Sequence, residues 1–172
     1  MKDTVFVVMG VSGSGKTTIG RLLAEKLALA FHDADDFHSA VNIDKMSAGT
    51  PLTDADRKDW LAAMADAIGQ WEQTGGAVLA CSALKETYRQ MLQAGAHRPL
   101  QWVYLDGSRE LLHNRLEARK GHYMGPLMLD SQLDTLEEPT YGIRIKLRED
   151  HTPEQVVTEI VHIVAAQTDH PL

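Results

Sequence analysis

Apolar residues follow two alternating patterns along the chain. Short, largely apolar runs occur at positions 4–9, 77–80 and 101–106, as is typical of parallel strands that helices cover on both faces. A helical period of apolar residues follows each run; the first helix is expected to begin at Lys16, and the third to be capped by Ser108. Repeated strand–helix units imply right-handed crossovers and a mostly parallel sheet. The pattern therefore predicts an α/β fold with helices on both faces of the sheet.

The remaining elements are predicted from helix caps and from a change of period. Residues 53–73 have the apolar stripe of a long amphipathic helix, and Thr53 is placed to cap it. The last helix is expected to start at the capping box of residues 152–155, which has proline at the first helical position. Residues 141–147 alternate apolar and polar side chains, which favours a strand at an edge of the sheet.

Composition and charge narrow the class of protein. The chain suits a single domain spanning residues 1–172, and its shares of hydrophobic (44%) and charged (24%) residues are those of a globular protein. The net charge of −7 repels a polyanion, so nucleic acid is not expected as a partner. Cys81 is the single cysteine, and no apolar run approaches the roughly 20 residues that span a membrane. We expect a cytoplasmic protein that makes no membrane contact.

Residues 10–17 carry the most specific motif. They read GVSGSGKT and match G-x-x-x-x-G-K-[ST] between a predicted strand and a predicted helix. Glycines let backbone N–H groups converge on phosphates, and the helix N-terminus adds the positive end of its dipole. Lys16 is expected to reach the β- and γ-phosphate oxygens and Thr17 to ligate Mg²⁺. The predicted nucleotide-binding residues are Gly10, Val11, Ser12, Gly13, Ser14, Gly15, Lys16, Thr17, Thr18 and Arg115.

Three uses of a bound nucleotide are open to such a loop: phosphoryl transfer to a small molecule, a GTPase switch and an ATP-driven motor. The chain has no N-K-x-D tetrapeptide of the kind that reads guanine, and it is short for a motor or an oligomeric ATPase. A glycine-rich turn without function is a further alternative, which the complete motif in the right context disfavours. The sequence therefore favours a kinase that uses ATP and Mg²⁺.

Several further segments carry a pattern beyond the phosphate loop. Aspartates cluster in FHDADDF at residues 31–37, where a second strand is expected to end, and a dense series of polar, aromatic and turn residues follows at 38–60. The other matching segments are CSALK at 81–85, Tyr88-Arg89, Arg115, RKGH at 119–122, SQ at 131–132 and LEEP at 136–139. Together these segments resemble the gluconate kinases, over roughly residues 4–139. Where the family commonly has Gly-Asp, His-Pro and Phe, this chain has Ala34-Asp35, His38-Ser39 and Leu133.

The resemblance implies both an activity and a fold. The activity is ATP-dependent phosphorylation of D-gluconate to 6-phosphogluconate, and the fold is a three-layer P-loop kinase fold similar to that of shikimate kinase. The family pattern further implies a five-stranded parallel sheet, a helical substrate-binding segment at about 35–75 and a mobile lid at about 119–135. Members of the family are typically homodimers, so a homodimer is expected. The likeness says little about residues 140–172.

The chemistry of phosphoryl transfer suggests roles for the charged residues. Charge spreads over the transferring oxygens, so cations are needed around the γ-phosphate. Lys16 is one, Arg119 of the lid is the expected second, and Arg115 is a further candidate, although both arginines could simply be cations that favour a helix C-terminus. Asp35 is the candidate base or orienter for the attacking hydroxyl, and Asp33 is a candidate to hold a Mg²⁺-bound water. Either aspartate could instead cap a helix or form a turn.

A sugar acid requires cations for its carboxylate and neutral partners for its hydroxyls. The candidate residues for binding the acid are Asp35, His38, Arg57, Ser82, Lys85, Tyr88, Arg89, His122 and Gln132. Arg57 follows two aspartates and could instead belong to a surface network. Two rival functions stay open: a kinase for another small polyhydroxylated acid, such as shikimate, and a nucleotide-binding module without catalysis.

Overall fold

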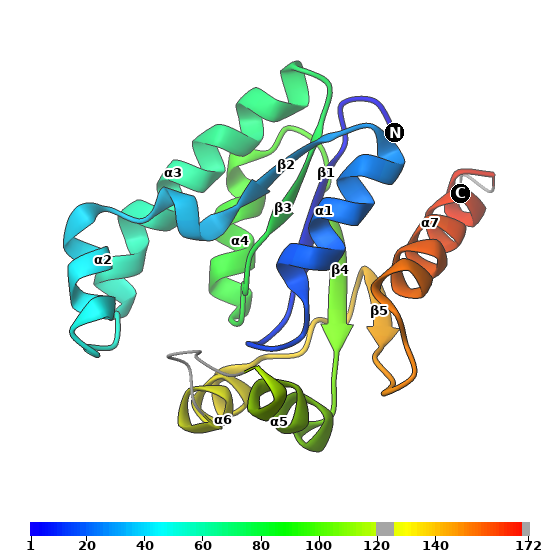
Figure 1. The fold of residues 1–172 in the computed structure, drawn as a ribbon. Helices are drawn as coiled ribbons and strands as arrows, with labels where there is room; N and C mark the ends of the chain where they lie inside the picture. The colour runs from blue at the N-terminus through cyan, green and yellow to red at the C-terminus, as the bar shows by residue number, and fades with distance from the viewer. Residues whose placement is uncertain (120–125, 170–172) are drawn as a thin grey trace.

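A five-stranded parallel sheet forms the centre of the computed structural model, which describes residues 1–119 and 126–169 (Figure 1). The strand order is β2-β3-β1-β4-β5, and each neighbouring pair is parallel. The strands are β1 (Val5–Met9), β2 (Ala30–Asp33), β3 (Ala77–Ala80), β4 (Gln101–Asp106) and β5 (Ile143–Lys146). This arrangement confirms the predicted α/β fold with a five-stranded parallel sheet.

Helices cover both faces of the sheet, as the alternation of buried side chains in β1 shows. Val5, Val7 and Met9 pack in one hydrophobic cluster with α3 and α4, whereas Phe6 and Val8 pack in another with α1 and α7. The helices are α1 (Lys16–Leu27), the 3-10 helix η1 (Ala34–Phe37), α2 (Ala40–Ser47), α3 (Asp54–Gln73), α4 (Glu86–Gly95), α5 (Arg109–Ala118), α6 (Pro126–Thr135) and α7 (Pro153–Asp169). The molecule therefore has the three predicted layers.

The parallel strands bring distant segments of the chain to one edge of the sheet. β1 lies between β3 and β4, and the chain leaves its carboxyl end through the phosphate loop, residues 10–17. Open parallel sheets bind ligands where the strand order reverses in this way. The segments that follow β2 and β3 reach the same edge, so Asp33 and Ser82 lie beside the phosphate loop.

Local signals in the sequence predict the helix starts well. Thr53 and Asp56 form a reciprocal capping box at the start of α3, and Ser108 caps α5. Thr152 and Gln155 exchange hydrogen bonds at the start of α7. The strand β5 lies at an edge of the sheet, with its residues alternately buried and exposed as the pattern predicts.

Apolar period alone does not predict the short elements η1, α2 and α6. Polar contacts hold α2 in place, because Asn42 Nδ2 donates to the Asp56 carbonyl at 2.8 Å and Lys45 Nζ donates to Asp56 Oδ1 at 2.7 Å. α6 contributes Leu129 to a small cluster with Leu112 of α5. In the described part of the chain, no helix is both long enough and apolar enough to cross a membrane.

Candidate active site

The phosphate loop owes its shape to its own backbone. Gly15 precedes α1 with a left-handed φ of 91°, and no side chain in the described residues caps the helix there. Ser14 is buried and donates from its hydroxyl to the Val11 carbonyl at 2.7 Å, which fixes the curve of the loop. Glycine adopts a left-handed φ without the steric cost of a side chain. The loop therefore presents the N-terminus of α1, with its positive dipole, to an anion.

Lys16, the first residue of α1, turns back over the loop. Its Nζ donates to the Val11 carbonyl at 3.1 Å, and the side chain lines a cavity of about 290 Å³ beyond the strand ends. Burial lowers the pKa of Lys16, while the nearby carboxylates of Asp35 and Asp33 oppose that shift. An ammonium group that has lost much of its water gains from an added anion, so Lys16 is suited to a phosphate ligand.

Asp33 makes two contacts at the end of β2. Its Oδ1 accepts from the N–H of Asp35 at 3.0 Å and caps η1, while its Oδ2 accepts from Thr17 Oγ1 at 2.9 Å. Hydroxyl and carboxylate oxygens are ligands that Mg²⁺ prefers, and this ion takes few protein ligands beside water and phosphate. Within the described residues, no three or more His, Cys, Asp or Glu side chains are grouped to hold a metal ion. Thr17 and Asp33 therefore fit an ion that also takes phosphate and water ligands.

Asp35 faces the same cavity from η1. Partial burial raises the pKa of its carboxyl group, and the Asp33 carboxylate raises it further, while His38 and Lys16 act in the opposite direction. A raised pKa makes a carboxylate a better proton acceptor near neutral pH. Both the position and the pKa of Asp35 suit a general base.

Trp60 and His38 form one side of the site. Trp60 lines the cavity and donates from Nε1 to the Ala34 carbonyl at 2.7 Å, which ties η1 to α3. The His38 ring stacks on Trp60 with 4.4 Å between the ring centroids. Burial lowers the pKa of His38, and its buried Nδ1 has no hydrogen-bond partner among the described residues. Trp60 belongs to the segment that resembles the gluconate kinases and also packs in the core, where its buried indole N–H needs an acceptor.

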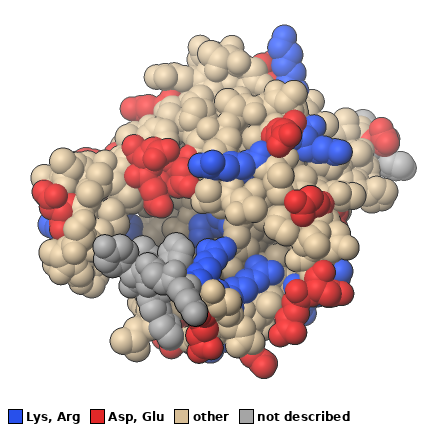
Figure 2. All heavy atoms as spheres, viewed as in Figure 1, with Lys and Arg blue, Asp and Glu red and all other residues tan. Residues whose placement is uncertain are grey.

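Several predicted site residues meet at the cavity, although they are far apart in the sequence. The catalytic candidates Lys16, Asp35 and Arg119 line it, as do Ser82 and Gln132. Figure 2 shows Lys and Arg side chains gathered around a hollow on this face of the molecule. The candidates outside the phosphate loop that do not line the cavity are His38, Arg57, Lys85, Tyr88, Arg89 and Arg115, and within the loop Gly10, Val11 and Ser14 do not line it. His122 lies outside the described residues.

Gln132 links α6 to the phosphate loop. Its Oε1 accepts from the Ser12 N–H at 2.7 Å, so a neutral amide oxygen accepts a hydrogen bond from the backbone of the phosphate loop. On the opposite side, α6 is tied to α5 by Asp130, which pairs with Arg109 and lies 2.9 Å from His113 Nε2. Polar contacts thus link α6 both to the phosphate loop and to α5.

Arg119 and Arg115 lie at the C-terminal end of α5. Arg119 is the C-cap residue and lines the cavity, while Arg115 is half-buried one turn earlier. Burial lowers the pKa of Arg115, and the charge of Arg119 lowers it further. Two guanidinium groups that repel each other gain from a shared anion. Both arginines lie where a positive charge favours the C-terminal end of the α5 dipole. Arg119 also lines the cavity, where a ligand would meet it.

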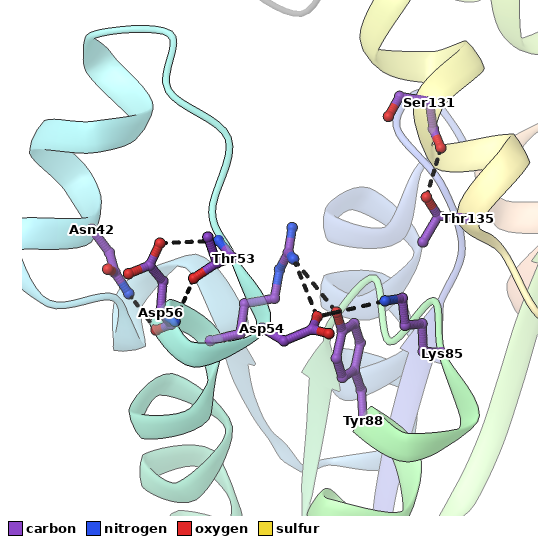
Figure 3. Close-up of polar contacts among 9 residues, drawn as sticks. Asn42, Thr53, Asp54, Asp56, Lys85, Tyr88, Ser131 and Thr135 are labelled. Carbon is purple, nitrogen blue, oxygen red and sulfur yellow. Dashed lines mark hydrogen bonds and ion pairs between the residues drawn. The ribbon is translucent and has the colours of Figure 1, made fainter.

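Four residues form what we call the acid-side cluster: Asp54, Arg57, Lys85 and Tyr88. Figure 3 labels Asp54, Lys85 and Tyr88 among them. The Tyr88 hydroxyl donates to Asp54 Oδ1 at 2.6 Å, and Lys85 Nζ lies 3.5 Å from the same oxygen. Arg57 joins the cluster through Tyr88, because its Nη1 donates to the Tyr88 hydroxyl oxygen at 3.4 Å. The surface network considered for Arg57 therefore exists, and it contains a second candidate cation, Lys85.

Arg89 has a different environment from the other candidate cations. It is only 2% exposed, and its guanidinium donates to the carbonyls of Ala83 and Glu137 at 2.7 and 2.8 Å. Its Nε lies 3.0 Å from both Glu86 Oε2 and the Tyr141 hydroxyl. The structure therefore does not bring Arg89 to the cavity; its buried guanidinium ties the loop after β3 to the segment after α6.

The phosphate loop, the cavity beyond the parallel strands and the carboxylates around it define a P-loop kinase, and residues 12–165 match the shikimate kinase family. A probable gluconokinase of Xenopus tropicalis is 45% identical over 91% of this chain and 90% of its own length. A gluconokinase of Gluconobacter oxydans is 48% identical over 81% of this chain and 78% of its own. A crystal structure of a gluconokinase from Sinorhizobium meliloti has a TM-score of 0.86 and 38% identity, covering 97% of this chain and 94% of that one. The chain belongs to the gluconokinase family and is a phosphotransferase, as its motifs predict.

Proposed function

We propose that this kinase transfers the γ-phosphate of ATP to the C6 hydroxyl of D-gluconate, giving 6-phospho-D-gluconate and ADP. The observation that carries the proposal is the 45% and 48% identity to gluconokinases over most of the chain. The site supports it in two ways. A phosphate loop and a carboxylate of raised pKa face one cavity, and a cluster with two cations lies beside that cavity.

The nucleotide end of the site would be formed by residues 10–18. Lys16 would pair with the β- and γ-phosphates, and the N-terminus of α1 would favour their negative charge. Thr17 would hold Mg²⁺ directly and Asp33 would hold it through water. When bound, that ion neutralises charge on the β- and γ-phosphate oxygens.

Asp35 would receive the proton of the attacking hydroxyl. Its raised pKa fits that role, and its place beside Lys16 puts the acceptor next to the phosphate-binding cation. Arg119 would stabilise the charge on the transferring phosphoryl group, with Arg115 behind it as a second positive charge. The sequence predicts a lid at about 119–135, and closure of this lid would exclude water from the reaction.

The far end of the substrate would be bound by the acid-side cluster. Arg57 and Lys85 would pair with the carboxylate, because they are the predicted acid-binding cations that lie near the cavity and are only partly buried. His38, Ser82 and Gln132 would bind hydroxyl groups, and His122 stays a candidate for the same role. We also propose a homodimer, from the family resemblance, and a cytoplasmic location, from the lack of a membrane-spanning apolar run in the sequence.

The direct test is an ATP-coupled screen of sugar acids with the product identified by NMR. We expect D-gluconate to be consumed in a one-to-one ratio with ATP and to be phosphorylated at C6. Phosphorylation of shikimate instead would favour the rival indicated by the family match at residues 12–165. ATP binding without turnover on any acceptor would favour a nucleotide-binding module.

A further inference from the structure

In the acid-side cluster, one carboxylate oxygen meets all three of the other members. Asp54 Oδ1 accepts from the Tyr88 hydroxyl at 2.6 Å, and it lies 3.5 Å from Lys85 Nζ and 3.9 Å from Arg57 Nη1 (Figure 3). A phenol, an ammonium and a guanidinium thus converge on a single anionic atom. These are the donors that a sugar acid's carboxylate requires, and the protein's own carboxylate already occupies them.

The cluster lies next to the cavity. Arg57 is one helical turn before Trp60 on α3, and Trp60 lines the cavity. Lys85 is three residues beyond Ser82, which lines the cavity from the end of β3. A ligand that places a hydroxyl in the cavity can therefore extend a carboxylate to this cluster.

The donors are held in place, while Asp54 is not. The Tyr88 ring is 8% exposed, and the charges of Lys85 and Arg57 lie 5.5 and 5.8 Å from its centroid. These cation–π contacts position both cations whether or not Asp54 is present. The Asp54 side chain is 70% exposed, against 35% for Lys85 and 33% for Arg57. An exposed carboxylate loses little free energy when it turns into solvent, because hydration replaces most of the interaction energy of the ion pair.

We infer that Asp54 occupies the acid subsite of the free enzyme, and that the substrate carboxylate displaces it from Tyr88, Lys85 and Arg57 on binding. This inference rests on the proposed function and adds a specificity-determining residue to it. The hydrogen bond from Tyr88 and the charge of Lys85 lower the pKa of Asp54, so the competing group is ionised at neutral pH. A neutral polyol offers no charge to replace Asp54, so the cluster discriminates against it.

A more ordinary role for Asp54 is that of an acidic residue in the first turn of α3, where it favours the helix dipole. That role makes a different prediction for substrate binding. A purely structural Asp54 would leave the KM for the acid unchanged or raise it on removal. A competing Asp54 lowers that KM when its charge is removed.

The test compares Asp54→Asn with the matched control Asp59→Asn, which removes one exposed charge from the same helix. We expect Asp54→Asn to lower the KM for D-gluconate about two- to fivefold, the range of an exposed ion pair, with kcat unchanged. The inhibition constant of the neutral analogue D-glucitol should be the same in wild type and Asp54→Asn. The control should resemble wild type for both ligands.

Each outcome of this test is decisive. An unchanged or raised KM for gluconate in Asp54→Asn would overturn the inference, and so would an equal gain for D-glucitol or the same gain in Asp59→Asn. Gluconate turnover by the wild-type enzyme tests the proposed function separately. If wild type does not phosphorylate gluconate, the proposed function fails; if it does and the variant shows no gain, only the role of Asp54 fails.

Discussion

The phosphate loop and the acid-side cluster, which we propose to bind ATP and the sugar acid respectively, are constructed in opposite ways. The loop is one run of eight residues, fixed by a buried hydroxyl, a left-handed glycine and the first turn of a helix. The cluster is assembled from the start of α3 and the start of α4, through side chains that share one exposed carboxylate. The proposed phosphate site is thus a rigid backbone structure, whereas the proposed acid site is made of side chains that can exchange partners.

This difference separates the expected effects of mutation. Groups at the phosphate end act on charge that develops during transfer, so their loss should lower kcat. Groups at the acid end bind a carboxylate that does not react, so their loss should mainly raise KM. Substitutions at the two ends of the site test that division.

Replacing Lys16 should have the largest effect. Lys16→Ala removes the cation that faces the transferring phosphate, so kcat should fall about a thousandfold or more with the fold retained. Steady-state kinetics and circular dichroism measure both quantities, with Lys26→Ala, an exposed position on the same helix, as the control. A folded Lys16→Ala enzyme with nearly normal kcat would contradict the assignment of the phosphate loop.

Replacing Asp35 should come next. Asp35→Asn retains some hydrogen bonding but accepts no proton, so kcat should fall about a hundredfold or more with little change in KM. Because the pKa of Asp35 is raised, wild-type kcat should decline as the pH falls through that raised pKa, and the variant should lose this acid limb. The pH profiles of both enzymes measure this, with Asp44→Asn as an exposed control. An unchanged acid limb in Asp35→Asn would assign the titration to another group.

Replacing Arg89 should change stability rather than chemistry. Arg89→Met leaves the carbonyls of Ala83 and Glu137 without their donor, so the free energy of unfolding should fall by about 2–4 kcal/mol. Urea denaturation measures this, with the exposed neighbour change Gln90→Ala as the control. A variant with wild-type stability and only a raised KM for gluconate would instead return Arg89 to the acid-binding residues.

Replacing Arg57 should have the smallest effect of the four, and on binding alone. Arg57→Ala removes a charged hydrogen-bond donor from the acid-side cluster, so the KM for gluconate should rise about ten- to a hundredfold while kcat changes little. Lys58→Ala, an exposed cation at the next position of α3, is the control. A fall in kcat larger than the rise in KM would place Arg57 with the catalytic groups and break the division between the two ends.

The same contrast explains how much the sequence predicts. The phosphate loop, its strand and its helix are contiguous, so one motif in context predicts all three. The helix caps at Thr53, Ser108 and Thr152 are equally local, since each depends on residues no more than three positions away. Parallel strands also bring their carboxyl ends together, which is why Asp33 and Ser82 could be expected beside the loop.

The acid-side cluster and its surroundings depend on contacts between residues that are far apart in the sequence. Tyr88 meets Asp54, and Trp60 meets Ala34, across many intervening residues. Arg89 lies next to a site motif, and only the structure shows that its buried guanidinium donates to backbone carbonyls. Family resemblance identified the important segments on this side, but it did not assign their side chains to partners.

The most direct test of the account is the kcat/KM for D-gluconate, shikimate and glucose, measured at saturating Mg-ATP. Glucose lacks the carboxylate that we propose to pair with the acid-side cluster, and shikimate holds its carboxylate and hydroxyl groups at fixed positions on a rigid ring. We predict a value for gluconate at least about a hundredfold above either competitor, because neither competitor can pair a carboxylate with the cluster while it places a hydroxyl group in the cavity. Comparable values for gluconate and either competitor would contradict the account.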